Sequence, residues 1–331
     1  MIENLLLGFE AAFTMTNLLF IAAGITLGIV IGAIPGLGSV TALAVLVPVT
    51  FYMSPVPAIA FLVGVNKGGT SGGAIPAILL NSPGTPEAAA SAMDGYPMAK
   101  RGEATRAMKF ALYSSVTGDT ISDCLLIFLV VPFAAIALQF GPLEYTTVLL
   151  FAFALLAGIS GRSPIKGLVA IFLGVFLSTI GLDPVDSTSR MTFDNVNLFD
   201  GIPLTALAIG TLALASILEQ MFDLKRDPAQ NRKVTKLAMQ ANTRLSPNEF
   251  FGYWKTIGRS ALIGSGVGML PGLGVTLAAF LSYGAARKAS SEPDSFGNGN
   301  PEGIIATEAA NSAVVGSNLI PTIALGVPGN I

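Results

Sequence analysis

Histidine is absent from the 331 residues, and cysteine and tryptophan occur only once each. Without histidine, histidine-ligated metal sites, histidine general bases and Ser-His-Asp triads are all excluded. Cys124 cannot form an intrachain disulfide, and its apolar run predicts a small core hydrophobe. No GxxxxGK[ST] motif occurs, so a nucleotide-binding P-loop in this chain is excluded as well.

Charge is scarce. Charged residues make up 11% of the chain, against about 25% in a typical soluble domain. Hydrophobic residues make up 52%, and the mean hydropathy is +0.69. The apolar runs 120–138, 145–160, 164–181 and 203–221 approach the ~20 residues that a membrane-spanning helix needs. The composition therefore predicts an all-α polytopic membrane protein.

The few basic residues are clustered, which predicts an orientation. Lys and Arg concentrate in segments 98–109, 161–166 and 223–259, whereas segment 181–200 has four Asp and one Arg. Because Lys and Arg gather on the cytoplasmic side, the three basic segments are expected inside and the acidic segment outside. The intervening spans then alternate correctly, and the N-terminus is expected outside.

Segment 223–257 is too charged to enter a membrane and is expected to be a cytoplasmic linker. It forms either an amphipathic helix on the lipid surface or a solvated connection; both interpretations stay open. Tyr253 and Trp254, just before the next apolar stretch, suit an interfacial aromatic belt. The net charge of -2 gives no indication of a nucleic-acid partner.

Two motifs occur twice in the chain. GAIPGLG (32–38) returns as GMLPGLG (268–274), 236 residues later. AIPAILLNSPGT (74–85) aligns with LIPTIALGVPGN (319–330), 245 residues later. Two ordered motifs at nearly constant offsets indicate an internal duplication.

The duplication predicts a transporter, because one copy begins outside and the other follows the cytoplasmic linker. Inverted repeats with Gly/Pro-interrupted helices are typical of secondary transporters and mark their binding sites. Broken backbone near the bilayer midplane is tolerated only where it is buried or lines a cavity. The predicted division is a first repeat (1–110), connecting transmembrane helices (111–222), the linker (223–257) and a second repeat (258–331).

The repeated segments combine glycines with hydroxyl and amide side chains, which suits a small carboxylate. Lys67 either attracts an anion or snorkels to an interface, and the NSPGT tip (81–85) is either a hairpin tip or an ordinary surface turn. Gly24, Gly28 and Gly32, at four-residue spacing, are expected to let helices pack closely. The substrate-binding candidates are Asn66, Lys67, Thr70, Ser71, Asn81, Ser82, Gly84, Thr85, Asn311, Ser312, Gly329 and Asn330.

A second set of residues could handle a coupling ion. Carbonyls freed at the two breaks offer oxygen ligands for a bound Na⁺, and no other cofactor is expected. Asp119 and Asp123 share a helix face, where they either bind a cation or proton or cap a helix near the surface. Glu308 either titrates or pairs with a polar neighbour. The ion-coupling candidates are Gly36, Gly38, Gly272, Gly274, Asp119, Asp123 and Glu308.

The chain resembles the large membrane subunit of tripartite tricarboxylate transporters, the TctA family. The matching stretches run along essentially the entire chain: GAIPGLG (32–38), NKGGTSGG (66–73), AILLNSPGTP (77–86), DGYPMAKRGEA (94–104), GMLPGLG (268–274), PEGIIATEAANSA (301–313) and LIPTIALGVPGN (319–330). The resemblance implies a multi-pass permease of the bacterial inner membrane, which is not an enzyme and imports citrate-like carboxylates using an ion gradient. It also implies an ion-transporter-like fold with re-entrant hairpins, a small TctB-like membrane subunit and a periplasmic TctC-like solute-binding protein.

Family members continue beyond the second hairpin tip, so the second repeat is expected to be truncated at its C-terminal end. Asn311-Ser312 stands where the family often has Asn-Asn, which leaves the substrate open. Two other functions compete with the transporter: a membrane-embedded enzyme that uses Asp119 and Asp123, and a passive anion channel. The sequence does not decide between Na⁺ and H⁺ coupling.

Overall fold

The computed structural model describes residues 8–34, 37–137, 141, 143–144, 146–147, 150, 164–183, 188–193, 195, 198–199, 201–202, 218, 245–270 and 274–325. Within these residues the protein is all-α apart from one short antiparallel hairpin, β1 (Gly181–Leu182) with β2 (Ser189–Arg190). The long elements are α2 (Met15–Gly32), α3 (Gly38–Leu46), α4 (Pro55–Leu80), α5 (Ala88–Met98), α6 (Ala104–Ala137), α8 (Pro164–Ser178), α12 (Trp254–Gly268), α13 (Gly274–Ala289) and α14 (Pro301–Ser317). Shorter ones are η1 (Val47–Tyr52), η2 (Ala99–Glu103), α11 (Pro247–Phe251), η6 (Pro293–Ser295) and α15 (Leu319–Leu325).

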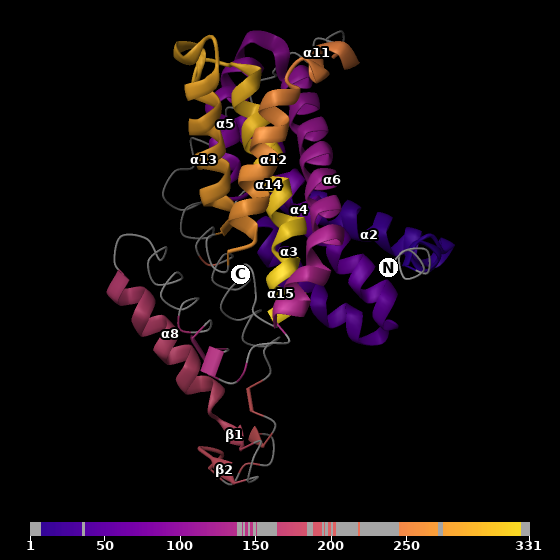
Figure 1. Cartoon of the computed structure of the whole chain (residues 1–331), viewed down its shortest axis with the longest axis vertical. Helices are drawn as coiled ribbons and strands as arrows, with labels where there is room; N and C mark the ends of the chain where they lie inside the picture. The colour runs from indigo at the N-terminus through magenta and orange to yellow at the C-terminus, as the bar shows by residue number, and fades with distance from the viewer. Residues whose placement is uncertain are drawn as a thin grey trace.

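Helix α14 is the core of the molecule. Every residue from Gly303 to Ser317 is buried, and α5, α6, α12 and α13 pack around the helix (Figure 1). Its sequence is dominated by small side chains, which allow close approach on all sides, as expected for a fully enclosed helix. Asn300 caps its first turn by accepting the Glu302 N–H, and Pro301 suits the first helical position.

Both PGLG motifs fall at a break between two helices. Helix α2 ends at Gly32 and α3 begins at Gly38; α12 ends at Gly268 and α13 begins at Gly274. Gly38 and Gly274 have φ of 55° and 77°, a left-handed conformation that only glycine adopts freely. The middle of each motif, with Pro35, Gly36, Pro271 and Gly272, lies outside the described residues.

Glycines hold α2 against α4 in the first half of the chain. A Cβ on Gly28 would collide with the Val65 carbonyl, and a Cβ on Gly32 would collide with the Gly69 carbonyl. The helices can touch backbone to backbone only because these side chains are missing. The packing role predicted for these glycines is confirmed.

The same contacts recur between α12 and α14. A Cβ on Gly264 would collide with the Ala310 carbonyl, and one on Gly268 would collide with Ser317 Oγ and lie 3.0 Å from the Val314 carbonyl. Each glycine lies 236 residues after its counterpart, and the Ala310 and Val314 carbonyls lie 245 residues after theirs. The offsets read from the motifs are therefore also the offsets of the helix contacts.

Asp94 joins the two halves. Its carboxylate accepts hydrogen bonds from the backbone N–H groups of Gly297, Gly299 and Asn300, at 2.8 to 2.9 Å. The Tyr283 hydroxyl donates a further bond of 2.9 Å. Asp94 is fully buried, so these four donors replace the water that its charge would otherwise require.

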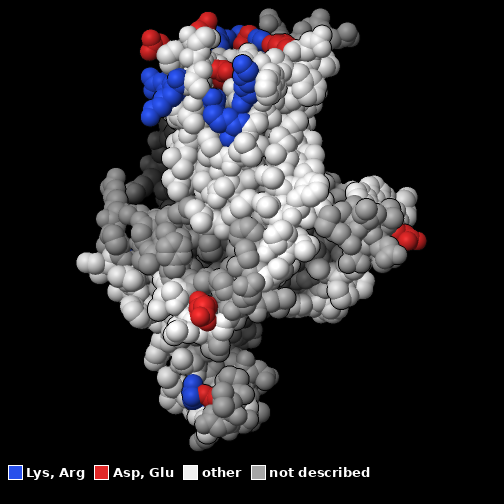
Figure 2. Space-filling view, viewed as in Figure 1, with Lys and Arg blue, Asp and Glu red and all other residues white. Residues whose placement is uncertain are grey.

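The cationic side chains gather at one end of the molecule. In Figure 2, Lys and Arg lie at the end where Figure 1 places α11 and the start of α12. Arg106 forms an ion pair with Glu249 of α11, so the basic segment 98–109 and the described part of the predicted linker share this end. Arg190, in β2 at the opposite end, pairs with Asp183.

By length and composition, two helical stretches among the described residues are able to cross a membrane: α2 and the segment Ala88–Pro132, which is kinked at Gly102. The apolar runs 145–160 and 203–221 lie almost wholly outside the described residues. The full multi-pass topology therefore stays a prediction.

Two helices cross the predicted domain boundaries. Helix α6 continues from Ala104 past residue 110, and α12 begins at Trp254, four residues before the predicted second repeat. Most of the segment 138–244 lies outside the described residues.

The prediction of a buried Cys124 is wrong, since its side chain is exposed. Its apolar neighbours on α6, including Ile127 and Phe128, are exposed too, so this run is apolar without being core.

Candidate functional site

A groove with several polar side chains in a mostly apolar lining lies between α2, α4, α6 and α14. It consists of two adjoining clefts of about 190 and 240 Å³, which share Ile29, Ser71, Leu112 and Ser115. We refer to both together as the central groove. Its polar lining comprises Lys67, Thr70 and Ser71 of α4, Ser115 and Asp119 of α6, and Ser312 and Glu308 of α14.

Equivalent positions of the two halves meet in this groove. Lys67 and Thr70 line it from α4, and the residues 245 positions later, Ser312 and Val315, line it from α14. Because α4 and α14 are the second helices of two similarly packed pairs, the groove lies between the halves. The lysine has no charged counterpart, since a serine occupies the equivalent position.

Lys67 is bound by two carboxylates. Its Nζ lies 2.6 Å from Asp119 Oδ2 and 2.6 Å from Asp123 Oδ2. The two aspartates lie four residues apart on α6, so their side chains stand one helical turn apart on the same face. The alternative that they cap a helix near the surface does not fit, since both lie well inside α6 (Ala104–Ala137).

The three charges leave one negative charge in excess. In addition, the other carboxylate oxygen, Asp119 Oδ1, is buried and has no hydrogen-bond partner among the described residues. Removing a carboxylate oxygen from water without a partner is unfavourable. The cluster therefore favours a further cation or proton at Asp119.

A fully buried carboxyl group also borders the groove. Glu308 is fully buried in α14 and accepts hydrogen bonds from the hydroxyls of Ser91 and Ser115. Ser91 also shares a 2.9 Å hydrogen bond with Thr307. Of the two alternatives left open for Glu308, pairing with polar neighbours is observed, and these neighbours come from α5 and α6.

Asn311 lies beside the groove on α14. It is 1% exposed, and its Oδ1 has no hydrogen-bond partner among the described residues. Its counterpart Asn66 is half-buried on α4. An amide oxygen without a donor in a buried position is a suitable ligand for a hard cation such as Na⁺.

The NSPGT tip (81–85) does not line the central groove but lies against the break between α2 and α3. The Gly84 N–H donates a 3.2 Å hydrogen bond to the Gly73 carbonyl, and a Cβ on Gly84 would collide with the Gly32 carbonyl. Across the break, a Cβ on Gly38 would lie 3.5 Å from Thr85 Cγ2. Among the described residues that line the central groove, none belongs to the tip.

The structure thus separates the predicted site into two places. Lys67, Thr70, Ser71, Asp119, Ser312 and Glu308 line the central groove, with Asp123, Asn66 and Asn311 on the same helices. Gly84, Thr85 and Gly38 lie together at the α2–α3 break, and Gly274 lies at the α12–α13 break. Asn81 and Ser82 lie at the end of α4, where the Ser82 N–H donates to the Pro76 carbonyl. Gly36, Gly272, Gly329 and Asn330 lie outside the described residues.

Two hydroxyls were missed by the sequence reasoning. Ser115 has a readable signal, because it precedes Asp119 and Asp123 at four-residue spacing and completes a polar stripe on an apolar helix. Ser91 has no such signal. It meets Glu308 across a separation of 217 residues, which no local pattern predicts.

A helical protein with two similarly packed halves and a groove lined by equivalent positions of both halves has an arrangement typical of secondary transporters. The profile of the tripartite tricarboxylate transporter TctA family matches residues 18–331. The chain therefore belongs to this family of transporter components.

Two curated relatives come from Agrobacterium vitis. The chain is 34% identical over 330 residues to a protein described as "Uncharacterized 52.8 kDa protein in TAR-I ttuC' 3'region", and it spans 64% of that protein's length. A second, "Uncharacterized protein in TAR-II ttuC' 3'region", is 42% identical over 67 residues, which are 20% of this chain and 28% of that protein. No solved structure matches.

Proposed function

We propose that this chain is the large membrane subunit of a tripartite transporter and imports small carboxylates across the bacterial inner membrane. An ion gradient, of Na⁺ or H⁺, drives the import. The observation that carries the proposal is the central groove, where Lys67 and Ser312, equivalent residues of the two halves, line one cleft together with Asp119.

The outer surface supports a membrane location. Large apolar side chains are exposed on α2, α6 and α12, for example Leu19 at 60%, Phe128 at 65% and Leu262 at 62%. Water would hydrate such a surface unfavourably, whereas lipid tails match it. On the face that Figure 2 shows, Lys and Arg lie mostly at one end, as expected for the cytoplasmic end of a multi-pass protein.

Matched helix pairs support the proposed inverted repeats. Helices α2 and α4 pack through glycines as α12 and α14 do, and the break after each first helix has the same positive-φ glycine. The charge pattern places the start of the α12–α14 pair on the cytoplasmic side and the start of the α2–α4 pair on the outside. On this basis the NSPGT segment forms a re-entrant hairpin tip.

The groove has donors for a carboxylate. The Lys67 ammonium and the hydroxyls of Thr70 and Ser312 are hydrogen-bond donors on the lining of one cleft. Charge-assisted bonds to carboxylate oxygens are about twice as strong as neutral ones. These groups suit a small di- or tricarboxylate, the substrate class that the family name indicates.

The excess negative charge supplies the coupling. Two like charges ~4 Å apart repel by about 4 kcal/mol at an effective dielectric constant of 20, so Asp119 and Asp123 oppose an entering anion. A proton on Asp119, or a Na⁺ bound there, cancels this repulsion and releases Lys67 toward the substrate. Glu308 and Asn311 provide further positions for a coupling ion.

Two partner proteins complete the proposed transporter. The small TctB-like membrane subunit and the periplasmic TctC-like binding protein are those that a tripartite system of this family requires. The binding protein delivers the carboxylate, and this chain moves it. In this scheme no residue of the chain has a catalytic role.

The test is uptake by proteoliposomes that contain this chain with both partner proteins. Uptake of labelled citrate and dicarboxylates is followed with and without Na⁺ and pH gradients, in wild type and in Lys67→Met, Asn311→Ala and Asn81→Ala. We expect saturable, gradient-driven uptake that is lost in Lys67→Met and reduced in Asn311→Ala. Lys100→Met, at an exposed lysine outside the groove, is the matched control.

The outcomes separate the competing functions. Non-saturable uptake without a coupling gradient contradicts the proposal and indicates a passive channel. Full activity of Lys67→Met contradicts the groove as the site. A loss confined to Asn81→Ala assigns the substrate to the NSPGT tip.

A further inference from the structure

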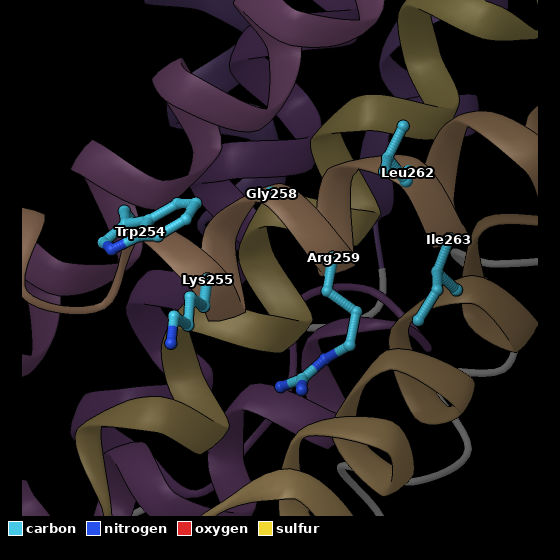
Figure 3. A pocket seen from close by; sticks show the side chains of 6 residues that line it. All are labelled: Trp254, Lys255, Gly258, Arg259, Leu262 and Ile263. Carbon is cyan, nitrogen blue, oxygen red and sulfur yellow. The ribbon is translucent and has the colours of Figure 1, made fainter.

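Helix α12 has a shallow groove on its outward face, away from the central groove. Its volume is about 600 Å³, and its lining residues are Trp254, Lys255, Gly258, Arg259, Leu262 and Ile263 (Figure 3). We refer to it as the α12 outer groove. All of its residues come from a single helix, so its shape follows from their helical spacing.

A missing side chain creates the hollow. Trp254, Gly258 and Leu262 lie four residues apart and form one row along the helix. Trp254 and Leu262 are 64% and 62% exposed, and a Cβ on Gly258 would meet nothing within 4 Å. The gap between the two large side chains is therefore open along the helix surface.

The neighbouring row carries two cations at its start. Lys255 and Arg259 are one helical turn apart, and Figure 3 shows both side chains extending to the same side of α12. Lys255 Nζ also lies 5.8 Å from the Trp254 ring centre. Within the part of the chain that the structure describes, neither cation has a carboxylate partner, and Arg259 Nε has no hydrogen-bond acceptor.

The groove is amphipathic along its length. It starts at the cationic end of the molecule, where Figure 1 places the start of α12, and ends at Leu262 and Ile263. A soluble anion would satisfy the cations and leave the apolar half unoccupied. A phospholipid with an anionic headgroup satisfies both halves, since Lys, Arg and Trp concentrate at headgroup level and the residues below meet acyl chains.

We propose that the α12 outer groove binds one anionic phospholipid. Its phosphate lies at Lys255 and Arg259, and one acyl chain follows the hollow at Gly258 toward Leu262. This inference rests on the membrane location proposed above and adds a ligand that the transport scheme does not contain.

Trp254 allows a direct test, because it is the only tryptophan in the chain. The chain is reconstituted in vesicles, and its fluorescence is quenched with brominated acyl chains carried on either phosphatidylglycerol or phosphatidylcholine. We expect half-maximal quenching at a several-fold lower fraction of the anionic lipid. The readout does not involve transport, so it stands or falls separately from the uptake assay.

Variants assign the preference to the groove. In the double variant Lys255→Gln, Arg259→Gln, we expect both lipids to quench Trp254 fluorescence equally. Lys288→Gln, at an exposed lysine of α13, should keep the preference for the anionic lipid. Gly258→Leu fills the hollow and is expected to weaken quenching by the anionic lipid. Gly284→Leu, at another open glycine, is its control.

Three results would overturn the inference. One is equal quenching of wild type by the two lipids. Another is a preference that survives loss of both cations. The third is protection of Trp254 from both lipids when the small membrane subunit is present, which would assign the groove to a protein contact.

Discussion

At the scale of single residues, the unequal charge of the Lys67 cluster is the feature with the clearest functional consequence. One ammonium lies 2.6 Å from each of two carboxylates, and the position equivalent to Lys67 in the second half is an uncharged serine. The ammonium of this charged cluster therefore comes from the first half alone, although the helices around the groove are arranged in similar pairs. Substitutions that change only the charge of this cluster therefore distinguish substrate binding from coupling to the ion gradient.

Asp119→Asn removes the excess charge and preserves the shape of the side chain. We expect substrate uptake that no longer responds to the ion gradient and falls at least about tenfold under a gradient, which is ~1.4 kcal/mol. Proteoliposome uptake at several ion gradients measures this. Asp123→Asn, at the more exposed partner with 44% side-chain exposure, should lose less. Wild-type gradient dependence in Asp119→Asn would show that the coupling ion binds elsewhere.

At the scale of helices, the protein depends on contacts that only glycine permits. In α12, Gly264 lies against the Ala310 carbonyl, whereas a Cβ on Gly266, two residues later, would meet nothing within 4 Å. The same substitution at these two positions therefore tests packing with helix propensity held constant.

Gly264→Ala should push α12 away from α14, lower the melting temperature in detergent and reduce the yield of folded protein. Gly266→Ala should be neutral or stabilising by up to about 1 kcal/mol, since alanine favours a helix over glycine. Thermal unfolding of the two purified variants measures the difference. Equal stability would contradict close contact between α12 and α14.

Sequence patterns anticipated the helix breaks because local chemistry dictates them. A proline followed closely by a glycine in the left-handed conformation interrupts a helix, so the breaks at Gly38 and Gly274 agree with the motifs. The all-α class follows equally from composition. Among the residues that line the central groove on α4, Lys67, Thr70 and Ser71 are substrate-binding candidates predicted from the sequence.

Long-range pairing could not be anticipated in the same way. Lys67 meets Asp119 across 52 residues, and Ser91 meets Glu308 across 217. Nor did the repeat show that the NSPGT tip folds back on the glycines of its own helix. Spacing along a chain specifies which residues share a helix face, whereas tertiary packing decides which faces meet.

At the scale of the whole molecule, the buried Asp94 holds the two halves together. Asp94→Ala would leave three backbone N–H groups and the Tyr283 hydroxyl without their acceptor. Each buried group that loses its partner costs about 1–3 kcal/mol, so we expect severe destabilisation. Tyr283→Phe removes one of the four bonds and should cost about 1 kcal/mol.

Thermal unfolding and limited proteolysis of the turn at residues 296–300 measure both variants. The proteolysis should accelerate strongly in Asp94→Ala and only slightly in Tyr283→Phe. If both variants have the same melting temperature as wild type, Asp94 does not hold the two halves together.

The Asp94 contact also imposes an order on biosynthesis. Asp94 leaves the ribosome 206 residues before Asn300, which at about 5–20 residues per second is a delay of roughly 10–40 seconds. During this interval the carboxylate lacks the three N–H donors that the later turn supplies. The first half of the chain is therefore synthesised before its hydrogen bonds to the second half can form. The two halves can pack against each other through Asp94 only once the turn has been made.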